Sequence, residues 1–117
     1  MKTYTIVRNG SIPQTNHGEH YCGFADAVEF PYRVELTVRG QLQPPQYFII
    51  ANEEMHDVVI RTCAGHSMSC ERMADSILDA MHSHVTANYS HWEIIKLHVE
   101  LTGTNGRANL SADYQAQ

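Results

Sequence analysis

The stretch from residue 69 to residue 101 constrains the fold most, because it joins one amphipathic helix to one amphipathic strand. The helical half carries apolar side chains three and four residues apart, at Ala74, Ile77, Leu78, Met81 and Val85. The strand half alternates, with Ile95, Leu97, Val99 and Leu101 on one face and Lys96, His98 and Glu100 on the other. An apolar helical stripe and an apolar strand face need each other, so this unit predicts a helix packed on a sheet.

Further strands are predicted on both sides of this unit. The clearest covers residues 32–39, where Tyr32, Val34, Leu36 and Val38 alternate with polar residues. Residues 3–8 predict a first strand that ends at the turn pair Asn9-Gly10, and residues 9–27 predict a long irregular loop. Residues 46–51 predict a partner of the second strand or its extension. Residues 107–112 predict a last strand after a hairpin at 103–106, followed by a frayed tail at 113–117.

A short helix is predicted to precede the main one. Asn52 is the expected N-cap, and Met55, Val58 and Val59 form the apolar stripe of a helix that ends near residue 62. Ser69 is the expected N-cap of the main helix. The element order is therefore strand-strand-helix-helix-strand-strand. It predicts one α+β domain over residues 1–117, an antiparallel sheet with both helices on one face.

Composition excludes several partner classes. The net charge of −5 and the pI of about 5.8 argue against binding nucleic acid through a basic surface. No apolar run approaches the roughly 20 residues that span a membrane, and no signal peptide is visible. The three cysteines form no C-x-x-C pair. These features predict a cytoplasmic protein whose cysteines are free thiols.

Four segments carry a resemblance to a known family. They are residues 32–40 (YRVELTVRG), 48–52 (FIIAN), 69–74 (SCERMA) and 99–102 (VELT). Their order and spacing resemble the tunnelling fold, and within it the 6-pyruvoyl- and 6-carboxy-tetrahydropterin synthases. The segment at 69–74 is similar to the family's TSENLA helix start. The resemblance implies subunits that line up their strands into a closed barrel, a homo-oligomer with the substrate pocket between neighbours.

The resemblance implies three substrate-binding residues. Glu100 falls where the family uses an acid to hold the 2-amino and ring N–H groups of a pterin or purine, a bidentate pairing that suits a carboxylate. The alternative is a solvated Glu100 paired with Lys96. Glu71 falls where dihydroneopterin aldolases, which share the fold, also carry an acid; an acid in a first helical turn is also favourable by itself. Asn52 lies near an Asp of the family pattern.

The resemblance also implies catalytic residues. Residues 19–23 (EHYCG) resemble the family's GHKCG loop, which makes Cys22 a candidate for proton transfer. His66 is the nearest histidine before Glu71 and is the candidate partner, although its spacing departs from the family pattern.

The family's zinc ligands are missing from this chain. That family binds zinc through one histidine of the first strand and a His-x-His pair before the second. Aligned on Tyr32, the pair falls on Val28 and Phe30, and residues 3–8 contain no histidine. No metal ligand is therefore assigned from the family pattern. A zinc site at His17, His20 and Cys22 is an alternative that their residue types allow.

Two functions follow from the resemblance. The first is a divergent tetrahydropterin-synthase-like protein that binds a pterin or purine-like base, with a lyase reaction on a pterin triphosphate as its implied chemistry. The alternative is a non-catalytic binding or assembly protein that kept the fold and lost the zinc site. The first expects a small-molecule ligand, and both expect a homo-oligomer without nucleic acid or membrane partners.

Overall fold

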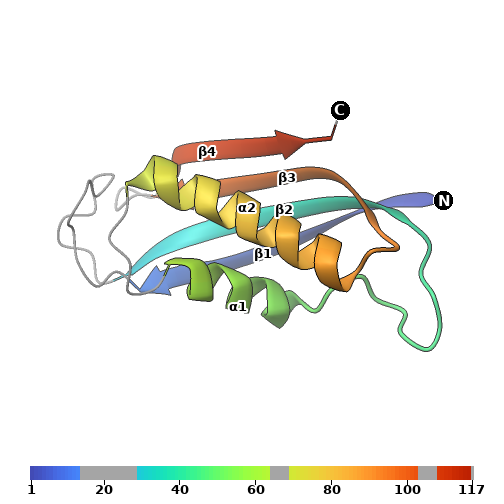
Figure 1. Ribbon diagram of the computed structural model, residues 1–117. Coiled ribbons are helices and arrows are strands. Elements are labelled where there is room, and N and C mark those ends of the chain that lie inside the picture. The colour runs from blue at the N-terminus through green and yellow to red at the C-terminus, as the bar shows by residue number, and fades with distance from the viewer. Residues whose placement is uncertain (14–28, 64–68, 103–107, 117) are drawn as a thin grey trace.

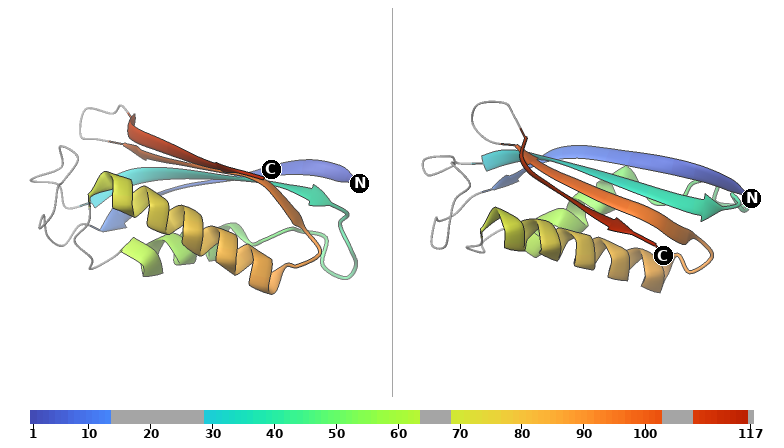
Figure 2. Two further views of the ribbon diagram at one scale, coloured as in Figure 1. Left: turned by 45° about the horizontal axis from the view of Figure 1, so that its top comes forward. Right: turned by 90° about the horizontal axis from the view of Figure 1, so that it is seen from above.

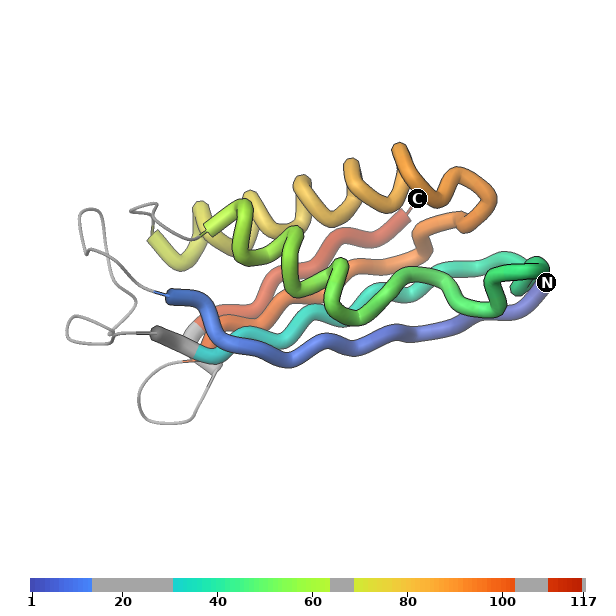
Figure 3. Tube along the Cα trace, turned by 90° about the horizontal axis from the view of Figure 1, so that it is seen from below, coloured from blue at the N-terminus to red at the C-terminus, as the bar shows by residue number. Residues whose placement is uncertain are grey.

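The computed structural model describes residues 1–13, 29–63, 69–102 and 108–116. Its chain order is β1 (Lys2–Pro13), β2 (Glu29–Gly40), α1 (Asn52–Cys63), α2 (Cys70–Asn88), β3 (Glu93–Thr102) and β4 (Ala108–Gln115). The four strands form one antiparallel sheet in the order β1-β2-β3-β4. Both helices lie on the same face of this sheet (Figures 1 and 3). The predicted α+β class and element order are confirmed.

The hydrophobic core lies between the sheet and the two helices. Alternate residues of the two central strands point into it and are almost fully buried: Tyr32, Val34, Leu36, Val38, Leu97, Val99 and Leu101. The helices contribute the apolar stripes that the sequence predicts: Met55, Val58, Val59, Ala74, Ile77, Leu78, Met81 and Val85. Burying apolar surface from both layers is what holds the helices on the sheet.

The first strand continues past the turn predicted at Asn9-Gly10, so that prediction is wrong. β1 runs on to Pro13, and Gly10 stands directly opposite Tyr32 of β2. A Cβ atom on Gly10 would lie 2.7 Å from Cε2 of the Tyr32 ring. The ring is further held by a 2.6 Å hydrogen bond between its hydroxyl and Nδ1 of His56 on α1. Gly10 therefore makes room for a buried ring and does not form a turn.

The alternation of β3 is interrupted by an irregularity near its start. Thr37 pairs with Lys96, but Val38 pairs with Ile94, so Ile95 is an extra residue on β3. Ile94 is buried at 8% exposure, whereas Ile95 is only partly buried. Ile94 thus takes the core position that the alternation assigned to Ile95, and the prediction is wrong at that residue.

Two predictions about chain segments outside the core strands are also wrong. Residues 46–51 form no strand; Ile49 and Ile50 are buried in an irregular segment that leads into α1. The segment 113–115, expected to fray, belongs to β4, where Asp113 pairs with His98 and Tyr114 with Leu97. The predicted hairpin at 103–106 lies outside the described residues.

Two smaller expectations concern the state of the cysteines and the absence of a membrane-spanning helix. Cys63 is a buried free thiol, and burial raises its pKa to about 12. Cys70 is also buried but is disulfide-bonded, so the expectation that every cysteine is a free thiol is wrong there. Neither α1 nor α2 is long and apolar enough to cross a membrane.

The face of the sheet opposite the helices is covered by no other described element (Figure 2). The polar residues of the central strands alternate onto this uncovered face. The register sets them in rows across the sheet, with Glu35, His98 and Asp113 in one row and Arg33 opposite Glu100 in the next. The candidate site lies on these rows.

Candidate functional site

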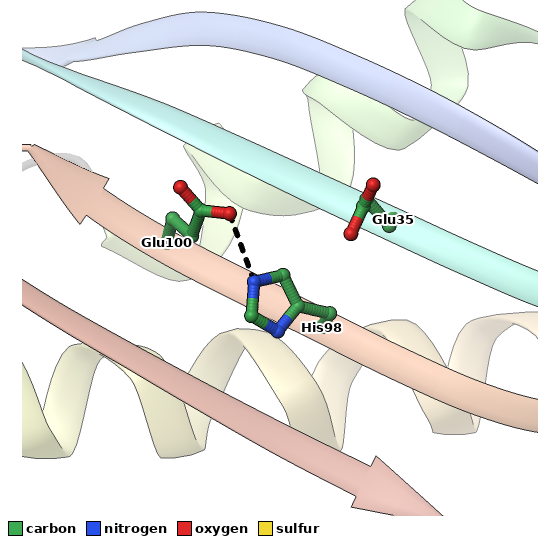
Figure 4. A group of neighbouring side chains, drawn as sticks. All are labelled: Glu35, His98 and Glu100. Atoms are coloured by element: carbon green, nitrogen blue, oxygen red, sulfur yellow. Dashed lines mark hydrogen bonds and ion pairs between the residues drawn. The ribbon is translucent and has the colours of Figure 1, made fainter. Parts of the chain in front are cut away.

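Three side chains from the two central strands meet on the uncovered face of the sheet. Glu35 comes from β2, and His98 and Glu100 come from β3 (Figure 4). His98 and Glu100 share a face because they are two residues apart on one strand. Glu35 joins them because antiparallel pairing places it directly opposite His98. One nitrogen or oxygen atom from each residue lies within 4.8 Å of those of the other two.

His98 is held at both ring nitrogens. Its Nδ1 lies 2.6 Å from Oδ1 of Asp113 on β4, and its Nε2 lies 2.9 Å from Oε2 of Glu100. Its side chain is only 16% exposed. Burial disfavours the charged ring, but the hydrogen bonds to the two carboxylates outweigh burial and raise the pKa of His98. A ring anchored in this way keeps Nε2 directed at Glu100.

Cations adjoin this group on both sides. Nη2 of Arg33 lies 3.0 Å from Oε1 of Glu35, and Nζ of Lys96 lies 3.8 Å from Oδ1 of Asp113. The expected alternative for Glu100, a pair with Lys96, is not what the structure has: the ion-pair partner of Glu100 in the described chain is His98. The uncovered face therefore offers carboxylate acceptors with positively charged donors beside them.

Asn52, one of the three predicted substrate residues, ties α1 to β1. It is the first residue of α1, because the carbonyl of Ala51 accepts the amides of Glu54 and Met55; the N-cap prediction is therefore wrong. Its side-chain amide donates to the carbonyl of Val7 at 2.9 Å, and its Oδ1 accepts from Nη1 of Arg8 at 2.8 Å. Asn52 thus lies on the helix side of the sheet.

Glu71 also lies on the helix side. It is exposed in the first turn of α2, after Ser69, whose hydroxyl accepts the amide of Arg72 at 3.2 Å and confirms the predicted N-cap. The structure therefore does not bring Asn52 or Glu71 beside Glu100 within one chain. The other candidates, Cys22 and His66, lie outside the described residues, as do His17 and His20.

A separate polar cluster joins the two helices. Glu54 of α1 accepts a 2.6 Å hydrogen bond from the Tyr89 hydroxyl and pairs with Nε2 of His84 at 2.5 Å. Burial raises the pKa of Glu54, but these two hydrogen bonds outweigh it and lower the pKa overall. Burial and the bond to Glu54 together raise the pKa of Tyr89 to about 12. This cluster stabilises the packing of α1 on α2 and stands on the opposite side of the sheet from Glu100.

A cleft in the described part of the chain lies between α2 and β4. It has a volume of about 510 Å³ and is lined by a set of mainly polar residues: Asp75, Leu78, Asp79, His82, Ser83, Asp113 and Tyr114. Glu100 is not among them.

The sequence indicated Glu100 as a candidate residue, but not its contact with His98 or the positions of Glu35 and Asp113 on either side of His98. The available signal was alternation, which already placed His98 on the polar face with Glu100. The strand register was also needed, because only pairing brings Glu35 and Asp113 to either side of His98.

Comparisons with known proteins show which of them share this architecture. No protein-family model matches the chain, and no curated protein matches its sequence. Among solved structures, the 6-pyruvoyl tetrahydropterin synthase of Caenorhabditis elegans matches 100% of this chain and 98% of its own, with a TM-score of 0.52 and 15% sequence identity. Identity this low shows a shared fold and no more. The chain therefore has the tunnelling fold of that synthase.

Proposed function

We propose that this protein binds a pterin or purine-like base and that Glu100 is the residue that holds it. The observation that carries the proposal is the position of the Glu100 carboxylate, one-third exposed on the uncovered face of the sheet and bonded to His98 through Oε2. The full-length likeness to a 6-pyruvoyl tetrahydropterin synthase supports a ligand of this class.

The chemistry of Glu100 suits such a ligand. Pterins and guanine carry a guanidine-like edge with two parallel N–H donors, and a carboxylate accepts both in a short, charge-assisted pair. Arg33 stands directly opposite Glu100 in the register and offers donors for a ring carbonyl oxygen. The side chain of Glu100 is fixed by His98, so less conformational freedom is lost on binding.

The proposal covers binding and stops short of the family's zinc-dependent lyase reaction. The positions that align with the zinc histidines are Val28 and Phe30, and β1, from Lys2 to Pro13, contains no histidine. These residues do not fit a zinc ion held in the family's manner, so no step is routed through one. A role for Cys22 in proton transfer stays a prediction.

The second candidate is an assembly protein on the same fold. β1 and β4 are the two edges of the sheet, and among the described residues each has one side of its backbone without a partner strand. Subunits that pair these edges would close the sheet and complete a pocket around Glu100. Size-exclusion chromatography with light scattering tests this: a homo-oligomer is expected, and a monomer at all concentrations would contradict it.

Calorimetric titration separates the two functions. Neopterin and guanosine would be titrated into the wild-type protein, Glu100→Gln and the control Glu93→Gln, which removes an exposed carboxylate from the same strand. Loss of a charge-assisted pair is worth about 1.5–3 kcal/mol, so Glu100→Gln should bind at least about 10-fold more weakly while the control is unchanged. A wild-type protein that binds neither compound would contradict base binding, and a Glu100→Gln variant that binds as well as wild type would contradict the role of Glu100.

A further inference from the structure

We propose that Glu35, His98 and Glu100 bind a divalent transition-metal ion such as Zn²⁺ on the uncovered face of the sheet. The position differs from that of the zinc histidines of the tetrahydropterin synthases, and the geometry of these three side chains supports a metal site independently of base binding. Carboxylate oxygens and an imidazole nitrogen are ligands that Zn²⁺ takes in proteins.

The spacing of the three side chains matches a common centre. Zinc bonds to nitrogen and oxygen are about 2.0–2.2 Å long, so two ligand atoms of a tetrahedral site lie about 3.4 Å apart. The ligand atoms here all lie within 4.8 Å of one another, and Nε2 of His98 is 2.9 Å from Oε2 of Glu100. Small side-chain rotations would bring all three onto one ion and leave the fourth position open.

Asp113 supplies the support that metal-binding histidines usually have. Its carboxylate lies 2.6 Å from Nδ1 of His98, the nitrogen that points away from the other two ligands. Asp113 holds the proton on Nδ1 and raises the basicity of the ring, so Nε2 would coordinate the ion after losing the proton that it donates to Glu100 in the metal-free protein. Asp113 is therefore a positioning residue in the proposed site.

The charge and rigidity of the three ligands also suit a bound cation. Two carboxylates balance the charge of a divalent ion, and all three ligands come from paired central strands, which hold them rigidly. Their side chains are between 16% and 33% exposed, which keeps an entry path open. Arg33 contacts Oε1 of Glu35 and leaves the other oxygen for the ion.

The metal and the base would compete for Glu100. Bidentate pairing with a base needs both oxygens of this carboxylate, whereas coordination occupies one of them. Glu35 takes part in the metal site only. The variant Glu35→Gln should therefore lose zinc binding and keep base binding, which makes the failure of one proposal distinguishable from the failure of the other.

Titration of the chelator-treated, full-length protein with Zn²⁺ tests the site, with Co²⁺ absorption as a second readout. Wild type should bind one ion at this site and show the intense visible bands of a low-symmetry Co²⁺ site. His98→Ala and Glu35→Gln should each lose them, and Asp113→Asn should bind about 10–100-fold more weakly. The control His91→Ala removes an exposed histidine outside the site and should bind as wild type does.

Two results would overturn the metal site. One is a wild-type protein that takes up no Zn²⁺. The other is Zn²⁺ binding that His98→Ala and Glu35→Gln leave unchanged, because the ion then lies at another site. Thermal melting of each variant shows whether it is folded. Because the two variants lie on different strands, loss of Zn²⁺ binding in both cannot be explained by the misfolding of one of them.

Discussion

Replacing Gly10 by alanine tests how tightly β1 packs on the Tyr32 ring. The backbone of Gly10 is outside the left-handed region, so the strand conformation itself tolerates a side chain. The obstacle is space: the new Cβ would lie 2.7–2.9 Å from Cε2, Oη and Cζ of Tyr32. This ring is 2% exposed and is anchored by His56, so it cannot move aside without losing that hydrogen bond.

The expected effect of Gly10→Ala is a net destabilisation. Overpacking a core costs about 1–3 kcal/mol, and the anchored ring places this site at the upper end. Replacing glycine in a strand returns about 0.5–1 kcal/mol through the unfolded chain. The net loss is about 2 kcal/mol, which for 117 residues lowers Tm by about 8 °C.

Urea or thermal unfolding followed by circular dichroism measures this change, and a double-mutant cycle isolates its cause. In a Tyr32→Leu background the ring is gone, so Gly10→Ala should become neutral or stabilising by about 0.5–1 kcal/mol. The reasoning is refuted if Gly10→Ala stabilises the protein with Tyr32 in place, or if it destabilises both backgrounds equally.

Two further stability predictions concern the helices. Removing the N-cap by Ser69→Ala leaves the amide of Arg72 without its side-chain acceptor and should cost about 1 kcal/mol in urea unfolding; an unchanged midpoint would contradict the cap. Tyr89→Phe removes a hydrogen bond to a charged carboxylate and should cost about 1.5 kcal/mol at pH 7. Because the folded pKa of Glu54 is lowered, its contribution is present above the ordinary value of 4.5 and is lost as the pH falls through the folded pKa. Wild type should therefore lose more stability than Tyr89→Phe between pH 7 and pH 3, and parallel pH profiles would argue against this pairing.

The parts of the fold that depend on short-range pattern could be predicted from the sequence. The alternation of Tyr32, Val34, Leu36 and Val38 identified β2, and the stripe that includes Ile77 and Met81 identified α2, because one buried face imposes the period. These elements, in order, also predicted the α+β class.

The errors arose where a distant contact decides the local structure. Gly10 looks like a turn residue, but a ring on the neighbouring strand determines its role. Ile95 fits the alternation of β3, yet the pairing with β2 shifts by one residue there. Asp113 looks like part of a tail, and only its partner His98 makes it part of a strand. Such contacts are invisible to a window of neighbouring residues.

The candidate site also contains one residue that the sequence indicated and others that only distant strand contacts reveal. Glu100 became a candidate because a resemblance pointed to that one position, and its role in binding stays a prediction. Its neighbours Glu35 and Asp113 are 65 and 13 residues away in the sequence, and the register alone brings them to His98. The resemblance also pointed to Asn52, but its side chain turns to β1 and bonds to Arg8, away from Glu100.

The most direct test of base binding by Glu100 is an NMR titration with neopterin that follows the His98 ring and the backbone amides of β2 and β3. A base bound at Glu100 would lie close to the His98 ring, whose Nε2 is 2.9 Å from Oε2 of Glu100, so saturable shifts are expected at the His98 ring and at the amides of Glu100 and Arg33. Shifts confined to the cleft between α2 and β4, or no shifts at all, would contradict the account.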